Sequence, residues 1–486
     1  MKMRFLLVLS LFLALLPGRT AGAYSVMTHE QLIDLTWDSA IVPLLLSRYP
    51  TLTPEQIEQA RAYAYGGCVI QDIGYYPFGD PFFSDLTHYV RSGDFVMNLF
   101  RNAGNANELA FAVGALSHYI GDSIGHSTAT NLAVPVEFPG LRKRYGNRVN
   151  YAEGQHQHVQ TEFAFDINEI AHHRLAPVHY LRHVGLQVST RQVELAFFQT
   201  YGIRRSFGDT RHHRINVRDY NWAVRRFIPR IAYATVLLHR KSEPVDPAND
   251  PEIARLSAEI AVVSAKNDWD AYRKNPGIGT YTLAGLIYIL PKVGPLKLVA
   301  VKGPTAQTEA EYVHSVLESS DALTYTLHRF TPPPSTRPTA DVAATADAAR
   351  NPESSDATPP KPGAAQAIPR GSIVPQHPLI NRDLDTGNPV KPAGYRLTDD
   401  TYATLLHDLA QYPTVPVPPG IKEDILTYYA DLSLPFATKK LPAAWQQVQT
   451  DLVTFRNMPT TTEPDALPTY DHPGEVDPSA VAEPQH

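Results

Sequence analysis

The chain has 486 residues, which is enough for about two or three domains. Its formal charge at pH 7 is −6, and this acidic balance argues against a protein dedicated to binding polyanions. Cys68 is the single cysteine, so an intrachain disulfide is excluded. We expect stability to come from core packing, with Cys68 as a small buried residue.

The first residues have the pattern of a secretory signal peptide. A basic start (MKMR) is followed by an apolar run over 5–16, a Pro-Gly break and the motif AGA at 21–23. The run is shorter than a membrane span requires. We predict a signal peptide over 1–23 and a secreted or periplasmic protein with no transmembrane segment in the mature chain. Cleavage removes three basic residues and no acidic one, so the formal charge falls from −6 to −9.

Apolar residues recur at three- and four-residue spacing from Thr28 to about Pro244, with little strand alternation. Thr53 followed by Pro54 is typical of a helix start, with an N-cap and a proline in the first turn. The pattern predicts an all-α fold, with a helical bundle over 24–245. The periodic stretches are 29–49, 53–67, 84–103, 107–129 and 158–174.

The remaining chain changes character several times. Residues 246–330 form a predicted helical extension, and its apolar segment 277–301 is interrupted by proline, glycine and lysine. This interruption favours a packing segment, with contact to a lipid interface as the alternative. Residues 331–375 are a predicted disordered linker rich in proline and alanine. A small helical C-terminal unit over 376–460 and a disordered tail over 461–486 follow.

The stretch HYIGDSIGH follows an apolar run and carries His118, Asp122 and His126, each four residues from the next. On a helix this spacing stacks the three side chains on one face. Buried imidazoles and carboxylates need partners, because an unpaired buried charge is costly. The spacing therefore predicts either mutual pairing or a bound metal ion.

Other residues of the same chemical types occur at intervals along the helical region. Zinc accepts such a mixture of nitrogen and oxygen ligands. After cleavage, the new terminus would also offer a free amino group and a carbonyl oxygen close to the first histidine. The further candidate ligands are Tyr24, through its main-chain atoms, His29, Asp72, His88, His158 and Glu162.

This order of residues resembles the zinc-dependent phospholipase C family, which is related in fold and metal site to single-strand-specific zinc nucleases. The resemblance covers about residues 24–175 and implies up to three zinc ions enclosed by an all-α bundle. It also implies Asp72 as a candidate base that orients the attacking water. The implied ligands are Asp72, His88, His118 and Asp122 for one zinc; His126, His158 and Glu162 for a second; and Tyr24, His29 and a bridging Asp122 for the third.

The chain departs from the family pattern at several positions. Tyr24 stands where the family usually has tryptophan, and main-chain chelation survives that change. The step from Asp122 to His126 is shorter than in the best-known members. Asp85 stands where Bacillus-type phospholipases carry an aromatic residue that helps to hold choline, so choline specificity does not transfer.

The resemblance implies a secreted zinc-dependent phosphodiesterase that hydrolyses phospholipids, at a membrane surface, to diacylglycerol and a phosphorylated head group by metal-activated water. A zinc nuclease on the same scaffold is the first alternative. A nuclease would require an aromatic pocket for a base and rows of basic residues for the phosphates, and neither is clear in this acidic chain. A non-catalytic, metal-stabilised binding protein is the second alternative. The sequence indicates neither an oligomeric state nor a head-group preference.

Overall fold

The computed structural model describes residues 25–76, 78–208, 211–239, 245–247, 249–274, 277–289, 303–330 and 379–461. The expected signal peptide, Tyr24, the 331–375 linker and the tail beyond residue 461 lie outside the described residues. Within these ranges the elements are helices, and the only strand-like pairings are two isolated bridges. The predicted all-α class is confirmed.

The first helices follow the periodic stretches of the sequence. At Thr53 the predicted helix start is a capping box, in which the Thr53 hydroxyl accepts the Gln56 N–H and the Gln56 side chain accepts the Thr53 N–H. Arg91 adopts a left-handed conformation (φ 47°), which divides the stretch 84–103 into two helices. The elements are α2 (Val26–Thr36), η1 (Trp37–Ile41), α3 (Val42–Arg48), α4 (Pro54–Gly67), η2 (Ile70–Tyr75), α5 (Pro81–Tyr89), α6 (Ser92–Asn102) and α7 (Ala106–Gly125).

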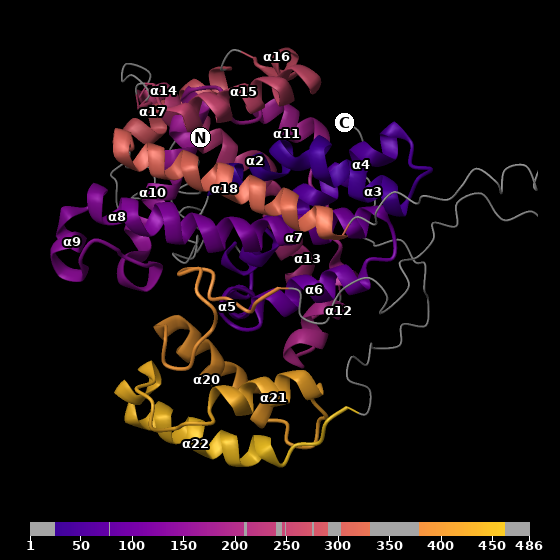
Figure 1. Cartoon of the computed structure of the whole chain (residues 1–486), viewed down its shortest axis with the longest axis vertical. Helices are drawn as coiled ribbons and strands as arrows, with labels where there is room; N and C mark the ends of the chain where they lie inside the picture. The colour runs from indigo at the N-terminus through magenta and orange to yellow at the C-terminus, as the bar shows by residue number, and fades with distance from the viewer. Residues whose placement is uncertain are drawn as a thin grey trace, which may run out of the picture.

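Helix α7 crosses the middle of the bundle and is buried along almost its whole length (Figure 1). It approaches α4 closely because two glycines lie at the contact. A Cβ added at Gly67 would lie 2.1 Å from the Phe111 carbonyl oxygen, and one added at Gly114 would lie 2.2 Å from the Ala64 carbonyl oxygen. This close packing fixes the helix that carries HYIGDSIGH.

Further helices surround α7 and complete the bundle. Helix α18 lies along α7 and buries Tyr312, Val316 and Leu317. The elements are η3 (His126–Thr130), α8 (Asn131–Glu137), α9 (Pro139–Tyr145), α10 (Tyr151–Ala171), α11 (Val178–Val184), α12 (Thr190–Tyr201), α13 (Arg211–Trp222), η4 (Ala223–Phe227), α14 (Ile228–His239), α15 (Pro251–Lys266), α16 (Trp269–Tyr272), α17 (Ile278–Ile289) and α18 (Ala306–Phe330).

Polar contacts in the core hold α2 against α10 and α18. The Thr28 hydroxyl donates to Asp166 at 2.7 Å, and it lies 2.8 Å from the Tyr312 hydroxyl. Arg174, which follows α10, pairs with Glu169 at 2.5 Å and with Glu309 of α18 at 2.9 Å. These buried contacts fix the N-terminal turn of α2, which carries His29.

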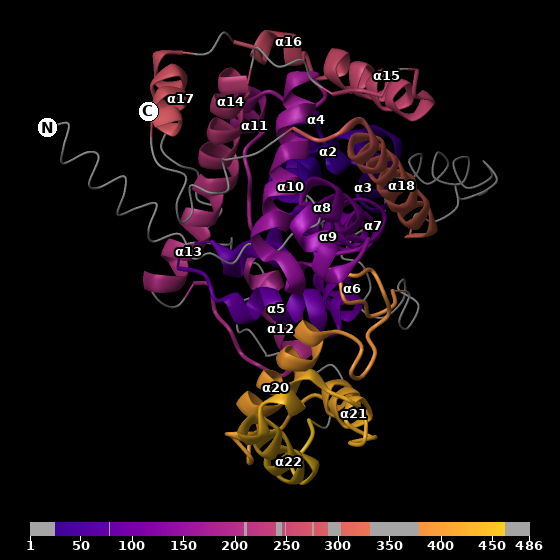
Figure 2. The same ribbon diagram turned by 90° about the vertical axis from the view of Figure 1, so that its left-hand side faces the viewer.

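The last described segment forms a small helical unit below α5 and α12 (Figures 1 and 2). The rings of Tyr402 and Tyr428 stack at its centre with centroids 3.7 Å apart. Its elements are α20 (Arg396–Ala410), α21 (Pro419–Tyr428), η6 (Ala437–Lys440) and α22 (Pro442–Arg456). No observation of the structure tests the domain boundaries expected from the sequence, so they stay predictions.

Among the helices of the described residues, none combines the length and the apolar character needed to cross a bilayer.

We expect Arg174→Met to lower the free energy of unfolding by about 3–5 kcal/mol, because it leaves two buried carboxylates without their cation. Urea unfolding followed by circular dichroism measures this loss. Arg255→Met is the matched control, since Arg255 forms exposed pairs with Glu259 and Asp321. It should cost less than about 1 kcal/mol. Equal losses for the two variants would contradict the role given to Arg174.

Candidate metal centre

Eight of the nine candidate ligands named from the sequence lie together in the core of the bundle. They form three groups in which the potential ligand atoms lie within 4.8 Å of one another, and every member is buried. The first group is His29, His118 and Asp122; the second is Asp72, His88 and His118; the third is His126, His158 and Glu162. Tyr24, the ninth candidate, lies outside the described residues.

Asp122 joins the first and second groups. Its Oδ1 lies 3.3 Å from His29 Nε2, whereas its Oδ2 lies 3.2 Å from His118 Nε2 and 3.4 Å from His88 Nε2. On the far side of the second group, Asp72 Oδ1 lies 3.4 Å from His88 Nε2. The two oxygens of Asp122 therefore face different imidazoles, as a carboxylate that bridges two ions requires.

The third group lies between α10 and the end of α7. Glu162 Oε1 is 3.4 Å from His158 Nδ1 and 3.8 Å from His126 Nε2. His158 and Glu162 are four residues apart on α10, so the helix itself places them side by side.

Hydrogen bonds to the second ring nitrogen orient several of these histidines. Nδ1 of His88 lies 2.7 Å from the Ser84 carbonyl oxygen, and Nδ1 of His118 lies 3.0 Å from the Cys68 carbonyl oxygen. A carbonyl oxygen only accepts, so Nδ1 carries the proton and Nε2 turns its lone pair toward the carboxylates. This arrangement is typical of metal-binding histidines.

His126 and His158 are oriented in the same way. Nδ1 of His126 lies 2.8 Å from the Leu384 carbonyl oxygen, and Nε2 of His158 lies 2.9 Å from Asn131 Oδ1 and 3.1 Å from the Val149 carbonyl oxygen. The opposite nitrogen of each ring faces Glu162. Sequence reasoning missed Asn131 and Leu384, because no local spacing connects them to the histidines.

His118, Asp122 and His126 follow one another at four-residue steps, and the helical backbone continues to His126, whose N–H donates to the Asp122 carbonyl oxygen. Helix α7 ends at Gly125, and a π-helical turn, η3, begins at His126. Each four-residue step advances about 6 Å along the helix axis, so His126 faces His158 and Glu162 while His118 and Asp122 face the other two groups.

Burial and neighbouring charges shift the pKa values in the centre. Burial raises the pKa of Asp122, but His118, His29 and His88 together hold it well below its usual range. In the third group, burial and the nearby His126 lower the pKa of His158. Burial, together with the charges of Asp122 and Asp72, raises the pKa of Glu162 well above its usual range.

The donor set fits zinc. Imidazole nitrogens and carboxylate oxygens are ligands that zinc accepts. Two potential ligand atoms, His126 Nε2 and Asp72 Oδ1, are buried and have no hydrogen-bond partner among the described residues. Such atoms are costly in a metal-free core, and a metal ion would satisfy them.

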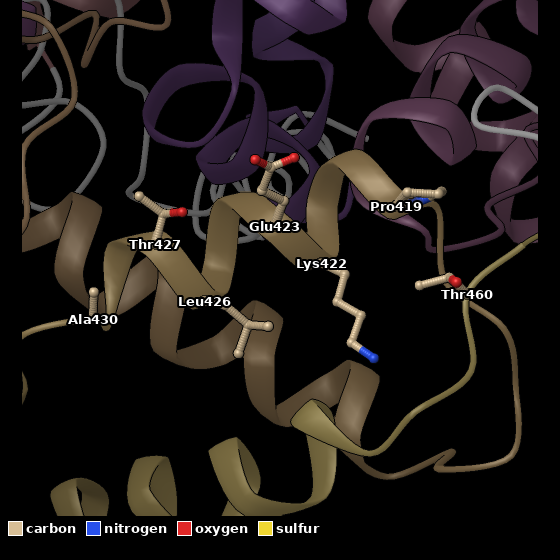
Figure 3. Close-up of a pocket in the computed structure, with 7 residues that line it drawn as sticks. All are labelled: Pro419, Lys422, Glu423, Leu426, Thr427, Ala430 and Thr460. Atoms are coloured by element: carbon tan, nitrogen blue, oxygen red, sulfur yellow. The ribbon is translucent and has the colours of Figure 1, made fainter.

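A hollow on the surface of the C-terminal unit is separate from this centre. Figure 3 shows it on α21, with Lys422, Leu426 and Thr460 around it. The other residues that line it are Pro419, Glu423, Thr427 and Ala430. None of the candidate ligands lines it, so the hollow takes no part in the metal chemistry.

Residues 28–210 match the family model described as zinc dependent phospholipase C. The resemblance expected from the sequence is thereby confirmed, and the match extends beyond the 24–175 range expected for it. No curated protein and no solved structure is significantly similar to the chain. The family match indicates a zinc-dependent phospholipase C hydrolase, and the three groups lie in the matched segment.

We expect removal of metal by a chelator to lower Tm by about 5–10 °C, and zinc to restore it. Zinc at about 100 times its dissociation constant stabilises the folded chain by ~2.7 kcal/mol, and each kcal/mol shifts Tm by about 2–4 °C in a domain of this size. Thermal unfolding with and without zinc, with metal content checked by elemental analysis, measures the shift. An unchanged Tm after complete removal would exclude a stabilising metal centre.

Proposed function

We propose that the protein is an exported zinc-dependent phosphodiesterase that hydrolyses phospholipids to diacylglycerol and a phosphorylated head group. The premise is the zinc-dependent phospholipase C match over residues 28–210. The observation that carries the proposal is the position of Asp122, whose two oxygens face histidines of two different groups. Bound zinc would supply activation of water near neutral pH and neutralisation of phosphoryl charge.

We assign the ligands by group. Asp72, His88, His118 and Asp122 would hold one zinc, and His126, His158 and Glu162 a second. His29 and the bridging Asp122 would hold a third, together with the main-chain atoms of Tyr24.

Asp72 is the residue best placed to accept a proton from the attacking water. Its side chain is 10% exposed, whereas those of His88 and Asp122 are 0% exposed, so Asp72 lies at the open edge of the centre. It stands in the short helix η2, and its Oδ1 has no hydrogen-bond partner in the part of the chain that the structure describes. A carboxylate at this edge can orient a water molecule and take its proton.

The proposal includes export because cleavage of the signal peptide would create a free terminus at Tyr24, whose main-chain atoms complete the third set of ligands. Ser25 is the first described residue; its side chain hydrogen-bonds Asp166, and its carbonyl oxygen accepts the N–H groups of Thr28 and His29. The chain just after the expected cut is therefore anchored beside His29. A new terminus at Tyr24 would bring its amino group close to that histidine.

Helix α17 supports action at a lipid surface. It carries no charged residue, and its inner side packs on α14 through Ala284 and Ile287. Its other side exposes Ile278, Tyr288 and Ile289, whose exposed fractions are 87%, 78% and 78%. A helix with an apolar outer face is suited to the membrane interface.

Arginines of the neighbouring elements favour an anionic surface. Burial lowers the pKa of Arg182, and the charges of Arg230, Arg226 and Arg225 lower it further, so these four cations lie close together. Arg230 belongs to α14, the helix on which α17 packs. Their mutual repulsion is relieved when lipid phosphates approach. The proposed docking partner of this face is an anionic phospholipid bilayer.

We expect the double variant Tyr288→Ser, Ile289→Ser to bind vesicles of phosphatidylcholine and phosphatidylglycerol at least about 10-fold more weakly, since each lost apolar side chain removes about 1.5–3 kcal/mol of burial. Vesicle co-sedimentation measures the binding. Val453→Ser, an exposed valine of α22, is the control and should bind like the wild type. Equal binding by all three proteins would refute the docking face.

We expect the zinc-loaded exported protein to release diacylglycerol from phosphatidylcholine vesicles, and chelator to abolish the release. His118→Ala should lower kcat/KM at least about 100-fold, because loss of a mere partner of a zinc ligand already costs 10- to 100-fold. His314→Ala is the matched control, since His314 is exposed on α18. The intact mass of the exported chain reports the cleavage site.

Single-stranded nucleic acid and other phospholipids are assayed in parallel. Hydrolysis of nucleic acid without hydrolysis of any phospholipid would overturn the proposal in favour of a nuclease. Full zinc content without turnover of either substrate would overturn it in favour of a binding protein.

A further inference from the structure

A segment of the C-terminal unit, Leu379–Val390, lies directly against the metal centre although it is far outside the family match. In Figure 1 it is the orange stretch between the bundle and the C-terminal helices. We call it the inserted loop. The Leu384 N–H donates to the His88 carbonyl oxygen at 3.1 Å, and the Leu384 carbonyl oxygen accepts from His126 Nδ1 at 2.8 Å. One residue therefore contacts two of the proposed ligands.

Asp385, the next residue of the inserted loop, is linked to His158 through Asn131. The carbonyl oxygen of Asp385 accepts from Asn131 Nδ2 at 2.8 Å. This contact leaves Asn131 Oδ1 to accept from His158 Nε2 at 2.9 Å. His126 and His158, the two histidines of the third group, thus both depend on main-chain carbonyls of the inserted loop.

The inserted loop is fitted to the bundle with little free space. Gly387 has φ 70°, and a Cβ added to it would lie 2.2 Å from the Ser123 carbonyl oxygen of α7. Within the loop, Asp383 accepts the Thr386 N–H and hydroxyl at 3.1 and 2.6 Å. At its start, Asn381 accepts the Asp94 N–H at 3.0 Å. These contacts set the direction of the carbonyls of Leu384 and Asp385.

The side chain of Asp385 anchors the inserted loop. It is fully buried, and its Oδ2 accepts from the Tyr395 hydroxyl at 2.6 Å and from the Tyr89 hydroxyl at 3.0 Å. Tyr89 follows His88 on α5, whereas Tyr395 belongs to the C-terminal unit. Oδ1 has no hydrogen-bond partner among the described residues. Burial raises the pKa of Asp385, and the charges of His126 and His88 lower it, as expected for a carboxylate close to both rings.

We propose that Leu384 and Asp385 are positioning residues of the metal centre, through which the C-terminal unit holds His126 and His158 with their free nitrogens toward Glu162. Metal affinity in the third group is then a property of the whole chain rather than of the family-matched segment. The inference rests on the proposed function only in taking the third group to bind a metal ion.

The test compares metal binding in full-length Asp385→Leu, Asp385→Asn and wild-type proteins. Asp385→Leu removes both anchoring hydrogen bonds, so one metal ion should bind about 10- to 100-fold more weakly while the others are retained. Asp385→Asn keeps an acceptor oxygen and should restore most of the affinity. Competition with a chelator measures affinity, and the visible absorption of the Co²⁺-substituted protein reports the ligand geometry of the weakened site.

Two tyrosine variants provide a second test that does not depend on the folding of Asp385→Leu. Tyr395→Phe removes one hydroxyl that Asp385 accepts, whereas Tyr402→Phe removes a hydroxyl donated to Asp424 inside the C-terminal unit. Only Tyr395→Phe should weaken metal binding and change the Co²⁺ spectrum. Unchanged affinity and spectrum in Tyr395→Phe, or equal changes in both variants, would overturn the proposal.

Measuring metal affinity and lipid hydrolysis separately distinguishes this inference from the proposed function. Weaker metal binding in Asp385→Leu without any lipid hydrolysis by the wild type would support the inserted loop and refute the phospholipase. Lipid hydrolysis with metal binding unchanged in Asp385→Leu and Tyr395→Phe would do the reverse.

Discussion

The buried carboxylate of Asp122 is the group on which the arrangement of the bundle depends. A negative charge in an apolar core is costly unless cations or strong donors surround it. Here His29 of α2, His88 of α5 and His118 of α7 all point at its two oxygens. Each of these helices must therefore hold a fixed position relative to α7. The glycine contacts between α4 and α7, and the contacts of Thr28 with α10 and α18, provide that rigidity.

A second layer of hydrogen bonds makes the rings usable as ligands. The carbonyl oxygens of Ser84, Cys68 and Leu384 each take one ring proton and leave the opposite nitrogen facing the carboxylates. Backbone carbonyls are well suited to this task because they do not ionise and move little within packed helices and turns. Two of the three lie close to the ligand helices, whereas Leu384 comes from the far end of the chain. The centre is thus assembled from most of the length of the protein.

The proposed function has to reconcile a nearly closed core with a large substrate. Most of the proposed ligands are fully buried, and Asp72 lies at the one edge where the side chain of a group member is 10% exposed. The exposed apolar side of α17 and the arginines around α14 belong to the surface rather than to the core. The proposed chemistry and the proposed lipid contact would therefore use separate parts of the fold.

The sequence by itself determined the local features of this protein. The helical period predicted the all-α class, and the pair Thr53-Pro54 predicted a helix start. The four-residue spacing predicted that His158 and Glu162 lie side by side, because residues four apart on a helix are neighbours whatever surrounds them. The order of donor residues indicated the zinc-dependent phospholipase C family, which the match over residues 28–210 confirms.

Only the tertiary structure decided which distant groups orient the donors. The carbonyl oxygen of Asp385 accepts from Asn131, which in turn accepts from His158, and no local motif connects these residues. The contact between His126 and Leu384 joins residues 258 positions apart. Such contacts depend on which apolar faces pack together over the whole chain, and the spacing of residues within a helix carries no information about that choice.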